Sequence, residues 1–259
     1  MPDFLVAGAQ KAGTTSLWEY LSEHPHVRSP MKKEMMFFDK NFSRGLNWYR
    51  MHFPFPQPGT DGATACGEST AYYMFHPLAP QRIAEALPGV RIVLLLRNPA
   101  DRAFSHYQLN LRRGNEHLSF EDALKAEPGR LAGERERLIA DPSYYSFEHE
   151  RHSYLARGRY AEQLRVWQSL ISRERLLILD SSNFFKNTAE VFDRVADFLG
   201  LPRWRPREFG NRFPGEYQAK MNEATRQWLI DYFRPHNAKL YELLGRDFSW
   251  EQRTRQRAA

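Results

Sequence analysis

Apolar residues along the chain gather in short runs that alternate with amphipathic segments. The clearest run, 90–97, is almost continuously apolar before it ends in an arginine, which is typical of a strand buried on both faces of a parallel sheet. Shorter runs at 4–9, 63–67 and 176–180 also predict strands. Segments with helical spacing or helix-capping residues lie at 14–21, 78–87, 99–111, 160–170, 188–199, 223–233 and 236–244. This alternation predicts an α/β fold with a central parallel sheet and helices on both faces.

We predict little regular structure in the rest of the chain. Segment 41–58 is rich in aromatic residues and proline, so we expect an irregular surface excursion there. No internal repeat or low-complexity linker divides the sequence, and 259 residues are enough to bury one sizeable core. We therefore expect a single domain over 1–259, with a peripheral tail from about residue 251.

A glycine-containing loop connects the first predicted strand to the first predicted helix. In this arrangement backbone N–H groups and a helix N-terminus point at an anion, and the hydroxyls of Thr14 and Thr15 can add hydrogen bonds to phosphate oxygens. The spacing of Gly8 and Gly13 matches the first part of a Walker A motif, but Thr14 stands at the lysine position and the lysine lies within the loop, as Lys11. This P-loop-like arrangement favours a nucleotide with one 5′-phosphate group, and an ordinary strand-to-helix turn is the alternative.

Three further positions carry candidate chemistry. Arg97 ends the best-predicted strand, where a permanent charge either pairs with an acid such as Asp101 or faces an anion at the mouth of the sheet. Ser105 on the following helix either joins Arg97 on a second phosphate or lies on the helix surface. Glu34 lies between Lys33 and an apolar Met-Met-Phe-Phe run, a setting that suits either a general base or a solvated glutamate on a helix face.

Composition narrows the classes of partner. The chain has 37 Lys and Arg against 31 Asp and Glu, a mildly basic balance that fits an anionic ligand and is too small to indicate nucleic acid. The single cysteine, Cys66, allows no intrachain disulfide and fits a reducing compartment. No segment is long and apolar enough to span a membrane. We therefore expect a soluble, cytoplasmic protein without stable membrane insertion, and the sequence indicates no oligomeric state.

Metal-dependent chemistry is disfavoured. The nine histidines show no metal-ligand spacing, and Cys66 is alone. The strand that ends at Arg97 offers no Walker B aspartate to hold Mg²⁺. We therefore predict a site that binds no metal.

Three motifs occur in order along the chain. They are the loop at 8–15, Lys-Glu-Met-Met-Phe-Phe-Asp at 33–39, and Arg-Asn-Pro-Ala-Asp-Arg-Ala-Phe-Ser-His-Tyr at 97–107. Together they resemble the sulfotransferase superfamily that uses 3′-phosphoadenosine 5′-phosphosulfate (PAPS), nearest the branch of the heparan sulfate N- and 3-O-sulfotransferases. Segments 158–167 and 240–250 also resemble that branch, so the resemblance covers nearly the whole chain and suggests a bacterial-type member.

The resemblance implies PAPS as the donor, its desulfated form (PAP) as the product, and no metal. It makes Glu34 the general base and Lys11 the catalytic cation that stabilises charge on the leaving oxygen. Residues 11–16 would hold the 5′-phosphosulfate, Arg97 and Ser105 would hold the 3′-phosphate, and part of segment 211–220 would cover the nucleotide. The expected donor-binding residues are Lys11, Ala12, Gly13, Thr14, Thr15, Ser16, Arg97, Ser105, Arg212 and Tyr217.

The sequence does not identify the acceptor. Relatives that act on heparan sulfate carry a lysine where this chain has Ser69, so a cation expected near the sulfuryl group or the acceptor is missing. The resemblance implies sulfation of a hydroxyl or amine on a small molecule or a carbohydrate-bearing acceptor. A P-loop small-molecule kinase and a non-catalytic nucleotide- or polyanion-binding protein are the alternatives. Aromatic residues that either line an acceptor cleft or belong to the core or surface are Trp48, Tyr49, Phe53, Phe55, Tyr72, Tyr73, Tyr144 and Tyr145.

Overall fold

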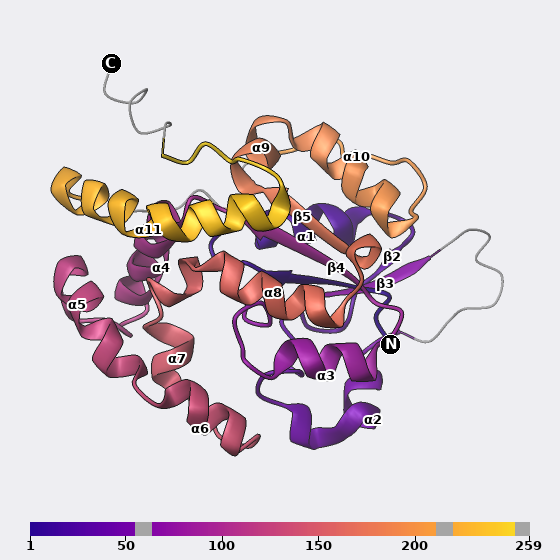
Figure 1. Cartoon of the computed structure of the whole chain (residues 1–259). Helices are drawn as coiled ribbons and strands as arrows, with labels where there is room; N and C mark the ends of the chain where they lie inside the picture. The colour runs from indigo at the N-terminus through magenta and orange to yellow at the C-terminus, as the bar shows by residue number, and fades with distance from the viewer. Residues whose placement is uncertain (55–63, 211–219, 252–259) are drawn as a thin grey trace.

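A computed structural model describes residues 1–54, 64–210 and 220–251 of the chain (Figure 1). The strands are β1 (Phe4–Gly8), β2 (Val27–Arg28), β3 (Ala65–Ser69), β4 (Arg91–Leu96) and β5 (Leu176–Asp180). The α-helices are α1 (Thr14–Glu23), α2 (Gly45–Arg50), α3 (Ala79–Ala86), α4 (Pro99–Arg112), α5 (Phe120–Leu131), α6 (Glu134–Ala140), α7 (Phe147–Arg151), α8 (Tyr160–Leu170), α9 (Ser181–Lys186), α10 (Thr188–Leu199) and α11 (Glu223–Leu244). The 3₁₀ turns are η1 (Phe42–Arg44), η2 (Ala156–Gly158) and η3 (Arg173–Arg175).

The described strands form one five-stranded sheet in the order β2-β3-β1-β4-β5, and all pairs are parallel. In the register, Leu5 of β1 lies beside Glu68 of β3 on one side and Ile92 of β4 on the other. The chain leaves β1 toward β3 and later crosses back to β4, so the carboxyl end of β1 is a topological switch point. Ligands of open parallel sheets bind at such points.

Helices cover both faces of this sheet, as the sequence predicts. Tyr20 of α1 packs against Phe184 of α9 and Phe192 of α10, and these three helices share one face. On the other face α8 packs against both α3 and α11, and it crosses in front of the strands in Figure 1. The helices α5, α6 and α7 extend beyond the sheet, next to α4.

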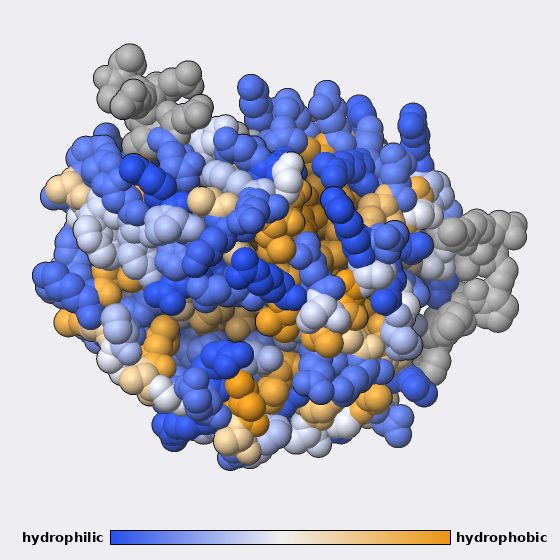
Figure 2. All heavy atoms as spheres, in the orientation of Figure 1, coloured by the Kyte–Doolittle hydropathy of each residue, from blue (hydrophilic) through white to orange (hydrophobic). Residues whose placement is uncertain are grey.

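The core is built on β1 and β4, two of the strands that the hydropathy pattern predicts. β1 is buried throughout, and every residue of β4 after Arg91 is fully buried. Gly67 of β3 allows close packing here, since a Cβ at this position would lie 2.1 Å from the ring of Phe4. On the outside of the molecule, polar and charged residues cover most of the face in Figure 2, with apolar residues visible in a band across its middle.

Two sequence predictions about regular structure were wrong. The excursion predicted at 41–58 contains η1 and α2, because Tyr49 is drawn into the core and stacks on Phe37 with a centroid distance of 4.3 Å. The two C-terminal helices predicted around Pro235 form the single helix α11. Its buried residues continue through the proline at helical spacing, and their packing outweighs the local cost of a mid-helix proline. These residues are Leu229, Ile230, Phe233, Asn237 and Leu240.

Within the described residues, no helix is long and apolar enough to cross a membrane.

Candidate active site

The loop after β1 leads into the N-terminus of helix α1 through residues with left-handed backbone geometry. Gly13 lies at φ 101° and Lys11 at φ 69°, and these left-handed residues turn the chain from the strand into the helix. A side chain at Gly13 would be strained and would also meet the Phe185 ring at 2.9 Å. The helix has no side-chain N-cap and no acid in its first turn. Its N-terminal N–H groups and positive dipole end therefore suit an external anion.

Several arginine side chains lie near the Lys11 ammonium of this loop. The Lys11 ammonium is partly buried, and burial lowers its pKa to about 8, with further lowering by the charges of Arg112 and Arg97. An anion bound at the loop would relieve this repulsion, because it stabilises the charged form of the lysine.

Arg97, at the end of β4, is tied to the loop. Its Nη1 donates a hydrogen bond to the carbonyl oxygen of Lys11 at 3.0 Å, and its own carbonyl accepts one from the Tyr160 hydroxyl at 2.9 Å. The acid considered as its partner, Asp101, instead pairs with Arg226 of α11 at 2.7 Å. Ser105 lies one turn beyond Asp101 on α4, and it is buried rather than exposed on the helix surface. Through its bond to Lys11, Arg97 is therefore attached to the loop that follows β1.

Glu34 lies on a half-buried segment between β2 and η1, and this segment is not a helix, so Glu34 does not lie on a helix face. The backbone after Glu34 is held by the end of β3. The Phe37 amide donates to the Tyr73 hydroxyl at 2.9 Å, and the Met36 amide contacts the Thr70 hydroxyl at 3.4 Å. Both hydroxyls donate in turn to the fully buried carboxylate of Glu68, Thr70 at 2.6 Å and Tyr73 at 2.8 Å.

Glu68 therefore organises the Glu34 segment through hydroxyl donors. Tyr49 supplies a third hydroxyl to the same carboxylate. Burial raises the pKa of Glu68, while the hydroxyl donors favour its ionised form. Sequence analysis missed this role, because the hydroxyl of Tyr49 on α2 joins those of Thr70 and Tyr73 around Glu68 only in the folded chain.

A buried arginine, which sequence analysis also missed, holds the loop from the opposite side. Arg157 of η2 donates to the side-chain oxygen of Gln10 at 2.6 Å and to the Ser153 hydroxyl at 2.9 Å. Its guanidinium also lies over the ring of Tyr72, 4.7 Å from the centroid. Because the oxygen of the Gln10 amide is occupied by Arg157, its NH₂ group is the part left to face a ligand.

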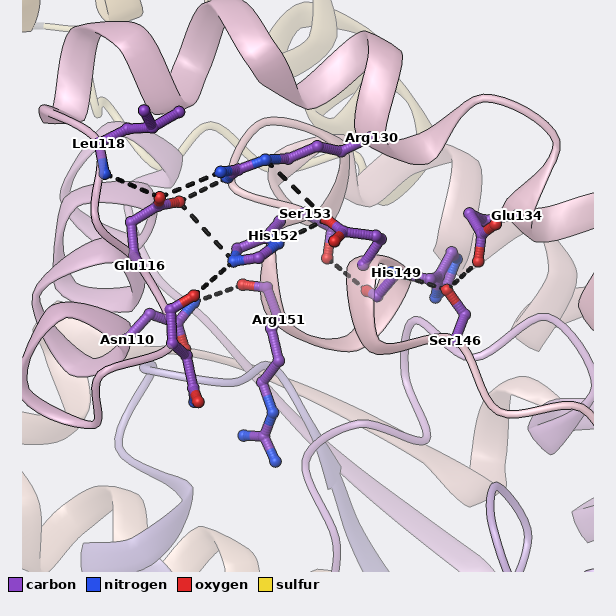
Figure 3. Close-up of polar contacts among 12 residues, drawn as sticks. Asn110, Glu116, Leu118, Arg130, Glu134, Ser146, His149, Arg151, His152 and Ser153 are labelled. Atoms are coloured by element: carbon purple, nitrogen blue, oxygen red, sulfur yellow. Dashed lines mark hydrogen bonds and ion pairs between the residues drawn. The ribbon is translucent and has the colours of Figure 1, made fainter.

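A polar network supports the segment that carries Ser153 (Figure 3). Arg130 of α5 makes two hydrogen bonds to Glu116, at 2.5 and 3.1 Å, and the Leu118 amide donates to the same carboxylate at 3.1 Å. His152, at the end of α7, lies 3.8 Å from Glu116. Burial opposes ionisation of Glu116, but its hydrogen bonds, that from Arg130 foremost, lower its pKa to about 2.

Several residues predicted for the donor site or the acceptor cleft lie outside the described residues or in the core. Arg212, Tyr217 and Phe55 lie outside the described residues. Of the aromatic residues considered for an acceptor cleft, three are core residues with at most 5% exposure, namely Tyr49, Phe53 and Tyr73. Tyr72 is buried as well and its hydroxyl lies 2.7 Å from Nδ1 of His149, whereas Tyr145 is 44% exposed.

Two hollows lie outside the loop. A cavity of about 20 Å³, the size of one water molecule, is bordered by Asp39, Tyr72 and Tyr145. A wide apolar pocket of about 740 Å³ lies between α5, η2 and α11, and its lining includes Leu124, Leu155 and Trp228. Neither lining includes Lys11, Glu34 or Arg97, so the loop site is distinct from both. Among the described residues, no cluster of three His, Cys, Asp or Glu side chains suits a metal ion.

Comparison with known proteins gives one consistent result. Residues 1–255 match the model of the sulfotransferase domain family. A solved sulfotransferase from Alicyclobacillus acidocaldarius is 31% identical and superimposes with a TM-score of 0.75, covering 97% of this chain and 99% of that one.

Curated relatives are similar over most of this chain. The membrane-associated sulfotransferase kil1 of Dictyostelium discoideum is 26% identical over 97% of this chain and 67% of its own length. The human bifunctional heparan sulfate N-deacetylase/N-sulfotransferase 2 is 30% identical over 95% of this chain and 30% of its own length. The chain thus spans about two thirds of the first relative and less than a third of the second.

Proposed function

The chain belongs to the sulfotransferase domain family, whose members take PAPS as sulfuryl donor, and we propose that it sulfates a hydroxyl or amine of a small-molecule or carbohydrate-bearing acceptor. The observation that carries the proposal is the hydrogen bond from Arg97 to the Lys11 carbonyl beside the uncapped N-terminus of α1. It joins the residues proposed for the two phosphate ends of the donor in one positively charged site.

In this proposal the donor lies along the carboxyl edge of the sheet. Residues 11–16 hold the 5′-phosphosulfate through backbone N–H groups and the hydroxyls of Thr14 and Thr15, and the ammonium of Lys11 contacts it. Arg97 and Ser105 hold the 3′-phosphate, and the segment with Arg212 and Tyr217 covers the nucleotide. The lowered pKa of Lys11 supports its place in the site, since this ammonium lies among other cations.

The chemistry is an in-line displacement at sulfur. The acceptor oxygen or nitrogen forms a bond to sulfur while the bond from sulfur to the bridging oxygen of the 5′-phosphate breaks, and that electron pair leaves with PAP. Lys11 and the N–H groups of α1 stabilise the charge that develops on the bridging oxygen. Glu34 accepts the acceptor proton, and the contacts of the adjacent backbone with Thr70 and Tyr73 support a fixed position for this base.

The kinase alternative is disfavoured by the same residues. Thr14 occupies the position at which a Walker A motif has its lysine, and β4 ends at Leu96 and Arg97 without an acid for Mg²⁺. The hydrogen bonds that hold the backbone after Glu34 fit a positioned general base, which a purely binding protein would not require.

Calorimetric titration tests the donor assignment without knowledge of the acceptor. We expect PAP to bind with micromolar affinity and ATP to bind weakly, with or without Mg²⁺. A preference for ATP that Mg²⁺ strengthens would overturn the proposal in favour of a kinase. Radiolabelled PAPS is then offered with N-desulfated heparan, p-nitrophenol and simple amines to find the acceptor class, and PAP binding without any transfer would support the non-catalytic alternative.

A further inference from the structure

Lys33, the residue before Glu34, reaches the first turn of α1. Its ammonium donates a hydrogen bond to the Thr15 hydroxyl at 2.7 Å, although the two residues belong to separate segments. Thr15 is one of the residues proposed for the 5′-phosphosulfate. Lys33 therefore brings a second lysine to the end of α1 that receives the donor.

Burial and the adjacent helix N-terminus both disfavour the charged form of Lys33. A cation at a helix N-terminus is repelled by the positive end of the helix dipole. Burial lowers the pKa of Lys33, although the nearby charges of Glu34 and Glu19 act in the opposite direction. The α1 terminus also has no capping side chain or first-turn acid. An anionic ligand against Thr15 would compensate for both the dipole and the burial.

The end of the neighbouring strand β3 lacks a cation that heparan-type relatives carry. Ser69, at the position where heparan-type relatives carry a lysine, is 2% exposed at the end of β3 and lies beside Val6 of β1. The next residue, Thr70, contacts the Met36 amide at 3.4 Å. The end of β3 and the segment with Lys33 are thus adjacent, so a lysine on that segment lies next to the place where the cation is missing.

We propose that Lys33 is a catalytic residue that binds the non-bridging oxygens of the 5′-phosphosulfate and supplies the positive charge that Ser69 does not. This inference rests on the proposed function. As the acceptor binds to sulfur and the sulfur–bridging oxygen bond breaks, the electron pair passes to the 5′-phosphate, and Lys33 stabilises that charge together with Lys11. The acceptor proton goes to Glu34, so Lys33 remains an ammonium throughout.

Lysine acylation in the whole protein, measured by peptide mass spectrometry with and without PAPS, tests this contact. We expect PAPS to slow acylation of Lys33 and Lys11 by tenfold or more and to leave the exposed neighbour Lys32 unchanged. Protection of Lys11 without protection of Lys33 would overturn the inference and leave the proposed function standing. Protection of neither lysine would overturn both.

Binding measurements on variants separate direct contact from a conformational effect of the donor. We expect Lys33→Ala to weaken PAPS binding by about tenfold or more, the size expected for a hydrogen bond to a charged group, and Lys33→Arg to retain most of the affinity. Lys32→Ala is the matched control and should bind PAPS like the wild type. Equal affinities of Lys33→Ala and Lys32→Ala for PAPS would overturn the inference.

Discussion

The guanidinium of Arg97 and the backbone of Lys11 are directly bonded, with Nη1 of Arg97 3.0 Å from the Lys11 carbonyl oxygen. The residue proposed for the 3′-phosphate thus also fixes the loop proposed for the 5′-phosphosulfate. A ligand that binds the Arg97 guanidinium therefore contacts a side chain that is already hydrogen-bonded to the loop. The two ends of the donor site are therefore coupled through one side chain.

Replacement of Arg97 tests this coupling. Lysine has a single ammonium and cannot reproduce the planar fork of arginine, so Arg97→Lys should lose either the loop contact or the phosphate contact. We expect PAP binding to weaken by roughly 10- to 100-fold in calorimetry. Adenosine 5′-phosphosulfate, which lacks the 3′-phosphate, should lose less affinity than PAP. An equal loss for both ligands would mean that Arg97 acts on the loop alone.

The affinity for PAP should depend on pH through Lys11. Its pKa is about 8 in the free protein because of burial and neighbouring arginines, and a bound anion raises it. The charged lysine therefore prevails below pH 8, and PAP binding should weaken by up to about tenfold per pH unit above it. Lys11→Arg keeps its charge and should weaken this dependence, and any dependence that persists is expected from Lys33, whose pKa burial also lowers. A wild-type affinity that is flat from pH 7 to 9.5 would contradict the prediction.

Glu34→Gln should separate chemistry from donor binding. The amide cannot accept the acceptor proton, so turnover should fall by about 10²- to 10⁴-fold. The affinity for PAP should change less than twofold, because Glu34 is not among the proposed donor contacts. Turnover is measured with labelled PAPS and an acceptor from the screen, and Glu136→Gln, at an exposed position on α6, is the control. Full activity of Glu34→Gln would remove it as the base.

The Glu68 network should affect turnover through Glu34. Tyr73→Phe removes the hydroxyl that connects Glu68 to the Phe37 amide while keeping the ring. We expect turnover to fall about tenfold with unchanged PAP affinity, an effect within the range for the loss of the two buried hydrogen bonds of this hydroxyl. In a Glu34→Gln background the same substitution should cost little more. Tyr107→Phe, which loses one hydrogen bond to the Leu118 carbonyl, is the matched control.

A similar loss of turnover in both backgrounds would instead mean that Tyr73 supports the fold in general and has no specific link to Glu34.

Stability should depend on pH through Glu116. Its folded pKa of about 2 is lower than the unfolded value, so its contribution is present above about pH 4.3 and is lost as the pH falls toward 2. Glu116→Gln should lower the free energy of unfolding by roughly 1–3 kcal/mol at pH 7, and this difference should shrink near pH 3. Asp193→Asn, in an exposed pair with Arg205, should change stability much less. Denaturant titrations at both pH values provide the measurement.

Much of the architecture follows from local patterns. The apolar run at 91–96, followed by Asn98 and Pro99, specifies a buried strand and a capped helix with little help from other segments. In the structure the side chain of Asn98 does accept a hydrogen bond from the Ala100 amide at 3.0 Å. α11 could not be predicted in this way, because the proline breaks the local pattern and only packing keeps the helix continuous.

In the candidate site, too, some features follow from local sequence and others depend on the tertiary structure. The sequence by itself determined the family, the glycine-flanked loop with Lys11 after the first strand, and the strand end at Arg97, because glycine spacing and strand hydropathy are properties of neighbouring residues. Only the tertiary structure decided that Arg97 bonds to the loop, that Glu68 holds the Glu34 segment, and that Lys33 meets Thr15. These contacts join residues 18 or more positions apart. They arise when parallel strands bring their carboxyl ends to one edge of the sheet, a consequence of chain topology that no local pattern encodes.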